Sequence, residues 1–365
     1  MQTYLSVLFS ILFLNILPFG DKKRTRVILP ISFLILWVFL AFRYNYGVDY
    51  INYNHLFYAP DTYDRSVESE PLFWWVMGLF EYYYQFIIFQ TTVICLTIFY
   101  FVRKYIAPQY YWLFFIIFMC HTGMMFTITT AMRSGFAALT FIWGTELFYI
   151  KQKKPLLFIL TIVISCLFHN SSVLLMLFPL SDYIMKRMSQ KIWTIFVGIG
   201  FIISITSISS YVETLLSMLS DSNSLSSYSN YIGSKFGDSS FTIALTHLFF
   251  AIPGFYLFKY INEDKSISIE YKRISYLTLM FMLLHVIGID FQNRLTVIFG
   301  LFYIISITTL IKATKRDTII RYAIFGLVIF STIWSTYVMF TILAIEQPEG
   351  SFWFYQTIFD APQLP

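Results

Sequence analysis

The stretch VILPISFLILWVFLAF (residues 27–42) runs without a charged residue into RYNYGVDYINY (43–53), which holds one Arg, one Asp, one Gly and four Tyr. The first part is an apolar helix that can cross the hydrocarbon core of a bilayer. The arginine that follows it needs a polar partner, because an unpaired charge near hydrocarbon is costly. This junction predicts a membrane-spanning helix that ends in a polar cluster at the membrane surface.

The composition of the whole chain agrees with this reading. Of its 365 residues 58% are hydrophobic and only 12% are charged, whereas about a quarter are charged in a soluble domain. Cysteines 95, 120 and 166 fall inside apolar runs, which argues against a disulfide framework and against a cysteine-based metal site. We read the N-terminus as a retained first helix, because it lacks the basic region and the cleavage site of a signal peptide. The sequence predicts an all-α polytopic membrane protein whose single integral membrane domain covers residues 1–365.

Further apolar runs recur along the chain, at 4–19, 27–42, 86–102, 110–126, 132–150, 192–210, 241–260, 273–289, 294–311 and 319–345. Residues 71–102 are too long for one crossing, since 32 helical residues span about 48 Å. The part rich in Trp and Tyr, PLFWWVMGLFEYYYQ, is expected to lie flat or to re-enter at the outer interface. Residues 43–85 then form an outer loop with an interfacial helix. The Ser-rich segment 211–240 forms a second outer loop, which is either flexible or equally a gate that becomes ordered.

Residues 155–185 are predicted to form a hairpin of two short helices with His169 at its tip. A hairpin keeps Lys151, Lys153 and Lys154 on the same side as Lys186, Arg187 and Lys191, as the positive-inside rule requires. The resulting arrangement has about twelve membrane-crossing helices and both termini outside. It places 20 of the 25 Lys and Arg residues on the inner side, so the net charge of +5 is a topology signal rather than a nucleic-acid signal.

Five polar side chains share one depth in this arrangement. Counted from the inner basic residues at 1.5 Å per residue, they lie about 22–27 Å away, just inside the outer boundary of the hydrocarbon. Asp49, Glu70 and the tyrosines of 43–53 follow directly above them. The five residues of this layer are Arg43, Arg133, His169, Asp290 and Arg294.

Such a layer fits a ligand with a lipid tail, a pyrophosphate at the interface and sugars outside. Arginine donates paired hydrogen bonds to phosphate, tyrosines offer faces and hydroxyls to sugars, and Asp, Glu or His can take a proton from an attacking hydroxyl. No D-x-D and no metal-like spacing of His and carboxylates occurs at the outer face, so no metal and no cofactor is expected. The candidate catalytic residues are Asp49, His169 and Glu70, and the candidate substrate-binding residues are Arg43, Arg133, Arg294, Tyr46, Tyr50, Asn170 and Asp290.

Structural roles remain open for the same residues. A single arginine near a helix end is commonly a membrane anchor, and Asp290 can pair with Arg294 four residues later on one helix face. The arginines can also pin the outer loops by pairing with Asp49, Glu70 and Asp290.

The motifs R-Y-x-Y-G-x-D-Y-x-x-Y (43–53), E-P-L-F (70–73), R-S-G-F-A (133–137), F-H-N-S-S (168–172) and N-R (293–294) resemble those of the EpsG family. These are Wzy-type polymerases of O-antigen and exopolysaccharide. The family has R-Q-G where this chain has R-S-G, which leaves the role of the Gln without a counterpart here. The resemblance implies a fold similar to GT-C glycosyltransferases, in a multi-pass protein of the bacterial inner membrane whose active site faces the periplasm.

The resemblance also implies the reaction and the partners. A growing glycan moves from undecaprenyl-pyrophosphate onto the next lipid-linked repeat unit, with membrane lipid and a chain-length regulator protein as further partners. Two other classes of function remain open. A flippase or exporter of the same glycolipid needs charges that line a passage through both leaflets. The inner halves of these helices are nearly free of ionisable groups, with Glu146 as the exception, which argues against a transporter. A ligase shares the whole polar layer and differs only in its acceptor.

The hairpin gives a first testable prediction. Cysteines introduced near Lys153 and near Arg187 should react with an impermeant reagent from the same side of the membrane. Reaction from opposite sides would turn 155–185 into one span and move His169 to the middle of the bilayer.

Overall fold

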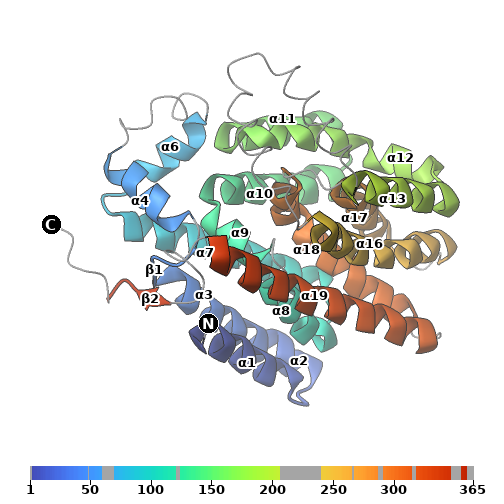
Figure 1. Cartoon of the computed structure of the whole chain (residues 1–365), viewed down its shortest axis with the longest axis horizontal. Coiled ribbons are helices and arrows are strands. Elements are labelled where there is room, and N and C mark those ends of the chain that lie inside the picture. Colours follow the sequence, from blue (N-terminus) through green and yellow to red (C-terminus); the bar gives the residue numbers. More distant parts are fainter. Residues whose placement is uncertain are drawn as a thin grey trace. The chain divides into compact units, whose positions relative to one another are not determined.

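The computed structural model describes residues 2–47, 49–59, 70–120, 124–205, 240–264, 267–286, 291–314, 318–346 and 355–359 (Figure 1). Nearly all of these residues are helical, and the only strands among them are two segments of two residues each. The chain divides into two compact units, one made of 1–179 with 332–365 and the other of 180–331. The all-α class predicted from the sequence is confirmed for the described residues.

The first unit holds the N-terminal half of the chain. Its early elements are α1 (Gln2–Ile16), α2 (Asp21–Lys23), a π-helical turn η1 (Arg24–Ile28), α3 (Leu29–Ala41), β1 (Arg43–Tyr44), α4 (Tyr50–Tyr58), α6 (Pro71–Met77) and α7 (Tyr83–Tyr105). Then follow η3 (Pro108–Tyr110), α8 (Tyr111–Cys120), α9 (Met125–Thr130), α10 (Met132–Gly144), a π-helical segment η4 (Thr145–Lys151), α11 (Pro155–Phe168), a 3₁₀ helix η5 (Asn170–Leu180) and the distant β2 (Gln356–Thr357).

Helix α3 forms the centre of the N-terminal part. Its Phe33 ring packs edge-on against Phe99 of α7, at 5.5 Å between centroids, and against Phe114 and Phe115 of α8. Polar side chains join the same helices inside this apolar packing, since the Trp37 indole donates to Thr92 Oγ1 at 2.9 Å. Aromatic stacking with a few paired polar groups is how helices associate where hydrocarbon offers no hydrophobic driving force.

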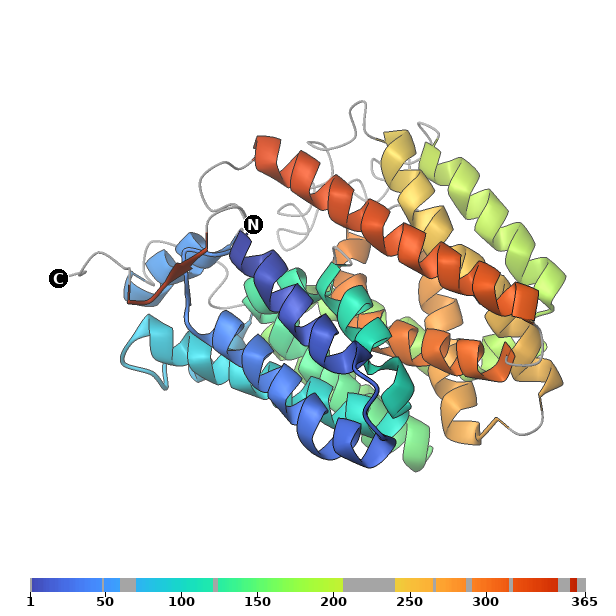
Figure 2. The same ribbon diagram turned by 90° about the horizontal axis from the view of Figure 1, so that it is seen from below.

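A two-stranded antiparallel ribbon closes the end of α3. Arg43 pairs with Thr357 and Tyr44 with Gln356, so the C-terminal segment lies along the start of the motif 43–53 (Figure 2). The chain then turns sharply, with φ of 44° at Asn45 and 114° at Gly47. Positive φ at these positions suits glycine and asparagine, which reach the left-handed region at low cost.

The long run 71–102 is divided as its length required. Pro71 opens the short helix α6, and Gly78 to Tyr82 separate it from α7, which begins at Tyr83. Proline at the first helical position loses no hydrogen bond there, which favours this start. That α6 lies at the outer interface of a membrane stays a prediction.

The chain reverses after His169. The Phe168 ring stacks on Phe136 of α10 at 5.5 Å, and Phe178 of η5 lies 6.3 Å from Phe141 of the same helix. Chain positions 168 and 178 therefore lie close to one another along α10, as in a hairpin. The second arm of the hairpin is a 3₁₀ helix, and Pro179 lies within it, where a proline is incompatible with regular α-helical hydrogen bonding.

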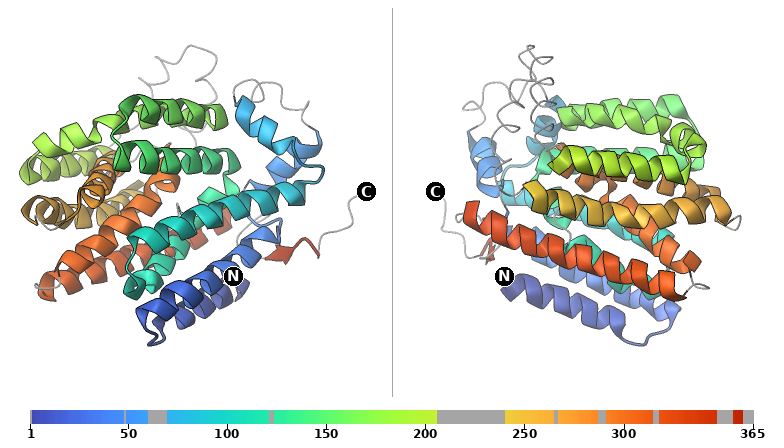
Figure 3. Two further views of the ribbon diagram at one scale, coloured as in Figure 1. Left: turned by 180° about the vertical axis from the view of Figure 1, so that it is seen from behind. Right: turned by 45° about the vertical axis from the view of Figure 1, so that its right-hand side comes forward.

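The second unit is an all-helical bundle (Figure 3). Its helices are α12 (Ser181–Arg187), α13 (Gln190–Ile205), α16 (Ser240–Glu263), α17 (Ile269–Val286), α18 (Phe291–Ala313) and the first part of α19 (Thr318–Glu346). The Trp193 indole of α13 donates to the Leu279 carbonyl of α17 at 3.3 Å. Phe250 of α16 stacks on Tyr303 of α18 at 3.9 Å between ring centroids. Aromatic side chains of α13, α16 and α18 therefore hold the helices of this unit together.

The described helices have the surface of a membrane protein. Within the described residues, three segments are long and apolar enough to cross a membrane: Asp21–Ala41, Tyr83–Tyr105 and Thr318–Tyr337. Shorter apolar helices expose large side chains, such as Phe13 of α1 at 66% and Leu156 of α11 at 81%. Contiguous exposed apolar surface marks a membrane or an interaction surface. The number of twelve crossings, the GT-C-like arrangement and the outer position of 211–240, most of which lies outside the described residues, stay predictions.

Helices α9 and α10 meet at a bend that depends on Gly135. Ala131 has non-helical backbone angles, with φ −81° and ψ 73°. A Cβ on Gly135 would lie 2.5 Å from the carbonyl oxygen of Ile128, which belongs to the backbone of α9 and cannot rotate away. The glycine of the R-S-G motif therefore permits the close approach of α9 to the first turn of α10.

Gly135→Ala should lower the stability of the folded protein by about 1–3 kcal/mol, because α9 must shift to admit the methyl group. Thermal unfolding of the purified protein in detergent measures this loss. Gly198→Ala in α13 is the matched control, since no atom lies within 4 Å of its Cβ position. That helix should gain about 0.5–1 kcal/mol, and equal behaviour of the two variants would contradict the packing argument.

Candidate functional site: a buried carboxylate group shared by three segments

The Glu70 carboxylate binds groups from two other segments of the first unit. Its Oε2 accepts a hydrogen bond from Arg133 Nη1 at 2.7 Å, and its Oε1 lies 2.6 Å from His169 Nδ1. The backbone N–H of Asn170 donates to the same Oε1 at 3.1 Å. Glu70 itself is only 3% exposed. We call Glu70, Arg133, His169 and Asn170 the Glu70 cluster.

The local folding of each segment explains this meeting. Glu70 precedes Pro71, the first residue of α6, so its side chain extends from the helix start. Arg133 lies in the first turn of α10, just after the bend at Ala131. His169 ends α11 in an extended conformation, with its backbone N–H bonded to the Ser165 carbonyl, and this frees Asn170 N–H to turn toward Glu70. Three motifs of the sequence, E-P-L-F, R-S-G-F-A and F-H-N-S-S, therefore converge.

Tyr53 of α4 brings in a fourth motif. Arg133 Nε donates to the Tyr53 hydroxyl at 3.1 Å, and the guanidinium lies 5.7 Å from the centre of the Tyr53 ring. Tyr53 is 5% exposed and its ring packs against Phe73 of α6 at 5.7 Å. The arginine is thus held on two sides, by a phenol and by a carboxylate, while its side chain remains 28% exposed.

The electrostatics of the cluster keep Glu70 ionised. Burial raises the pKa of Glu70, but the hydrogen bond from His169 and the charge of Arg133 outweigh it, so the pKa is lowered overall. Burial also raises the pKa of Tyr53, although Arg133 opposes this and Asp49 adds to it. The cluster therefore combines a charged carboxylate with a neutral phenol at ordinary pH.

Arg43 does not belong to the hydrogen-bonded cluster. It is 1% exposed. Its Nη1 donates to the Leu40 carbonyl at 2.5 Å and to Thr91 Oγ1 at 3.1 Å, and its Nη2 donates to the Thr129 carbonyl at 2.8 Å. These acceptors are neutral and come from α3, α7 and α9, which the guanidinium links together. The sequence placed Arg43 in the same layer as Arg133, but the structure buries it among backbone carbonyls.

The tyrosines expected to face sugars are also buried. Tyr46 is 1% exposed and meets the rings of Phe39 and Tyr355, and Tyr50 is 3% exposed against Tyr83. Burial raises the pKa of Tyr50 to about 12. The rings of Tyr46 and Tyr50 therefore pack inside the protein and hold the segment 43–53 against its neighbours. Sugar binding by them stays a prediction that their burial does not favour.

Three further candidate residues of the sequence analysis are Asp49, Asp290 and Arg294. Asp49 is partly exposed and precedes α4, where its carbonyl accepts the Tyr53 backbone N–H at 3.0 Å. Asp290 and the side chain of Arg294 lie outside the described residues. Within the described part of the chain, no three His, Cys, Asp or Glu side chains gather as metal ligands would.

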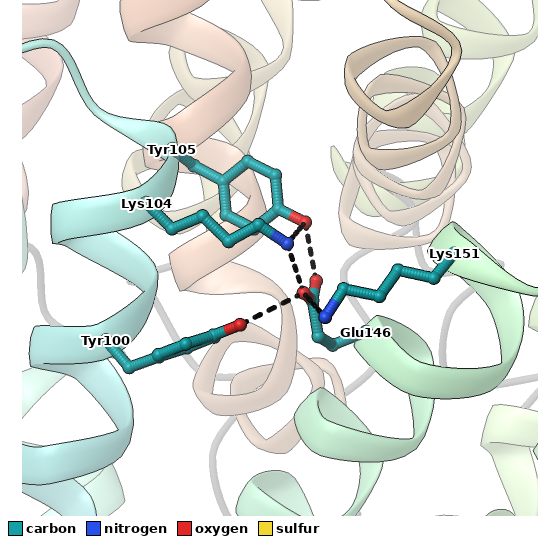
Figure 4. A network of polar contacts seen from close by, with 5 residues as sticks. All are labelled: Tyr100, Lys104, Tyr105, Glu146 and Lys151. Atoms are coloured by element: carbon teal, nitrogen blue, oxygen red, sulfur yellow. Dashed lines mark hydrogen bonds and ion pairs between the residues drawn. The ribbon is translucent and has the colours of Figure 1, made fainter.

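A second buried carboxylate, Glu146, lies at the other end of the α10–η4 segment (Figure 4). It forms ion pairs with Lys104 and with Lys151, the latter at 3.1 Å. The Tyr105 hydroxyl donates to its Oε2 at 2.5 Å and Tyr100 lies 3.5 Å from its Oε1. Both lysines belong to the predicted inner basic residues. Glu146, the exceptional ionisable residue in the inner halves of the helices, is therefore paired with cations of the predicted inner side.

Sequence reasoning missed two features of the site. The sequence groups Tyr53 with the tyrosines of 43–53 that could face sugars and does not predict its hydrogen bond with Arg133, although its spacing of four from Asp49 puts both near one helix start. The C-terminal ribbon had no signal, because Gln356 and Thr357 form a strand only by pairing with Arg43 and Tyr44. Tyr355 donates to the Phe39 carbonyl at 2.6 Å and fixes this end of the chain on α3.

The fold and the cluster together define an all-α membrane protein in which motifs far apart in sequence meet at buried helix ends. Residues 26–357 match the sequence profile of the EpsG family, and the chain belongs to that family. Membership places it among membrane proteins of the polysaccharide-polymerase type, with glycosyltransferase-like activity. Searches of curated proteins and of solved structures each found no match.

The lowered pKa of Glu70 predicts how acid acts on the fold. A depressed carboxyl pKa stabilises the folded state above the unfolded value of about 4.3, and this contribution is lost as pH falls below it toward the folded-state pKa. The melting temperature of the wild type should therefore fall over this range. That of Glu70→Gln, already lower at neutral pH, should depend less on pH.

Asp182→Asn is the control for this titration. Asp182 pairs with Lys186 four residues later on the same helix, and the two side chains are 20% and 44% exposed, so the ion pair contributes little. This variant should keep the acid dependence of the wild type. A Glu70→Gln curve parallel to that of the wild type would show that Glu70 is not held ionised.

Proposed function

We propose that this protein is a polysaccharide polymerase of O-antigen or exopolysaccharide type. It transfers a growing glycan from undecaprenyl-pyrophosphate onto a lipid-linked repeat unit. The reaction takes place at the outer face of the bacterial inner membrane. The observation that carries the proposal is the Glu70 cluster, in which three motifs share one hydrogen-bonded group, joined by Tyr53 of a fourth motif.

The cluster supplies a base for the acceptor hydroxyl. As that oxygen attacks the anomeric carbon of the donor sugar, its proton passes to the imidazole of His169 and the bond from carbon to pyrophosphate breaks. Glu70 at 2.6 Å favours the tautomer with hydrogen on Nδ1, so Nε2 carries the lone pair that accepts the proton. Glu70 then stabilises the imidazolium, as the buried carboxylate of a catalytic triad does.

Arg133 neutralises the leaving group. Pyrophosphate gains negative charge as the glycosidic bond breaks, and a fixed guanidinium stabilises that charge without reorganising. Arg133 is held by Tyr53 and Glu70 and keeps donors for an anion. Arg294 is proposed as a second cation, with Asp290 orienting it. No metal is required in this scheme, because arginine does what a divalent ion does in many nucleotide-sugar enzymes.

Other residues of the sequence hypothesis receive supporting or secondary roles. Arg43 holds α3, α7 and α9 in place below the site through its bonds to neutral acceptors. Asp49 is the alternative base, since it lies near Tyr53. Asn170 contributes its backbone N–H to Glu70. A chain-length regulator would act on the same protein as a partner.

His169→Gln should lower the rate of glycan extension by about 100-fold or more, the usual contribution of a general base. The measurement is the length ladder that purified protein makes from lipid-linked repeat units, at equal protein level and in excess EDTA. His55→Gln is the matched control, because His55 is an exposed histidine of α4, two residues after Tyr53 in the chain. It should leave the ladder unchanged.

Two outcomes of this experiment would contradict parts of the proposal. A full ladder from His169→Gln would remove His169 as the base, and activity that returns only with magnesium would remove the metal-free scheme. The glycans of a deletion strain separate the functional classes. A polymerase mutant keeps a core with a single repeat, whereas a flippase mutant has none and a ligase mutant keeps its polymer on the carrier lipid.

A further inference from the structure

The guanidinium of Arg133 has three nitrogens, and two of them are occupied. Nε donates to the Tyr53 hydroxyl at 3.1 Å and Nη1 donates to Glu70 Oε2 at 2.7 Å. Among the described residues Nη2 has no hydrogen-bond partner. Since the side chain is 28% exposed, Nη2 is the nitrogen left for a ligand.

The phenol of Tyr53 is built to hold that orientation. Its ring is 5% exposed and is fixed against Phe73 of α6 at 5.7 Å, so the hydroxyl has little freedom. Among the described residues the hydroxyl makes one hydrogen bond, as the acceptor from Arg133. Burial raises its pKa, so the phenol stays neutral and does not compete with an anion for the positive charge.

We propose that Tyr53 is a positioning residue for the anionic group of the substrate. Its hydroxyl accepts the hydrogen bond of Arg133 Nε, so that the anion binds at Nη2 instead. An arginine free on the Nε side would bind phosphate side-on through Nε and Nη2 in several orientations. With Nε occupied, only the edge away from Tyr53 remains, and this selects one approach for the ligand. The inference rests on the proposed function only in naming pyrophosphate as that anion.

The geometry makes the effects of two substitutions depend on each other. Tyr53→Phe removes the acceptor for Nε but keeps the ring that packs on Phe73. Arg133→Lys removes Nε together with the planar edges, while a lysine can still pair with Glu70. Once Nε is absent, the Tyr53 hydroxyl has no hydrogen to accept. Its removal should then have almost no further effect on anion binding.

The test is a double-mutant cycle on inorganic pyrophosphate binding to purified protein in detergent, read from the shift in melting temperature with sulfate as the anion control. Tyr53→Phe should weaken pyrophosphate binding by about tenfold, because Arg133 loses the partner that fixes its orientation and the ligand must then order the side chain itself. The double variant should bind no more weakly than Arg133→Lys alone. A merely structural role of Tyr53 would instead make the two losses add.

Tyr110→Phe is the control for losing a buried phenol. Tyr110 is 5% exposed, and its hydroxyl has no hydrogen-bond partner among the described residues. It should bind pyrophosphate as the wild type does. A second pair of variants repeats the comparison: Tyr53→His offers an acceptor for Arg133 Nε and Tyr53→Leu offers none. Tyr53→His should bind pyrophosphate more tightly than Tyr53→Leu.

Additive losses, or a wild type that does not distinguish pyrophosphate from sulfate, would overturn the assignment of Tyr53. These outcomes are separate from those of the proposed function, because anion binding is measured without glycan substrates. A protein with the predicted coupling but without a glycan ladder would keep Tyr53 in its role and would refute the polymerase.

Discussion

The carboxylate of Glu70 is the interaction on which the site depends. Removing a carboxylate from water is costly, and the cost is recovered only when its oxygens are well bonded. Glu70 meets this condition with Arg133 on one oxygen, and with His169 and the Asn170 N–H on the other. Because these groups come from α10 and from the turn after α11, the same bonds that permit its burial also fix the ends of two helices relative to α6.

The α10–η4 segment is held by a buried carboxylate at each end. Near its start Arg133 reaches Glu70, and near its end Glu146 joins Lys104 and Lys151. Glu146 and Lys151 of this second cluster lie in the π-helical segment η4, and the other members, Tyr100, Lys104 and Tyr105, come from α7. The helix that carries the R-S-G motif is therefore fixed at both ends, which limits the movement of the Arg133 side chain.

Arg43 and Arg133 illustrate how similar sequence contexts lead to different roles. Both lie at the boundary of an apolar run and at the same counted depth. Arg43 is enclosed by Leu40, Thr91 and Thr129, whose neutral oxygens accept hydrogen bonds from its two Nη nitrogens. Arg133 has a carboxylate and a phenol beside it and stays partly exposed. A buried arginine with neutral acceptors connects helices, whereas a partly exposed one is able to bind an anion.

Composition and local pattern were enough to predict several features of this protein. The apolar runs predicted the helices, because a helix alone satisfies its backbone within one segment in lipid. Charge asymmetry predicted a reversal near His169, and the excessive length of 71–102 predicted a break before α7. Counting depth from the inner basic residues placed Arg133 and His169 in one polar layer with Glu70 directly above it, and the chemistry of these side chains made them candidate functional residues. Each of these predictions rests on something that a short stretch of chain carries by itself.

Tertiary structure alone decided which of those residues meet and in what geometry. Depth counting measures one coordinate along each helix and cannot tell which faces turn toward each other. That is why Arg43 and Arg133 share one counted depth, and why the hydrogen bond between Tyr53 and Arg133 could not be predicted. The strand at Gln356 and Thr357 is the clearest case, since two residues have no periodicity and form a strand only where β1 offers free backbone groups. The helices follow from local chemistry, whereas the site follows from contacts between residues distant in the chain.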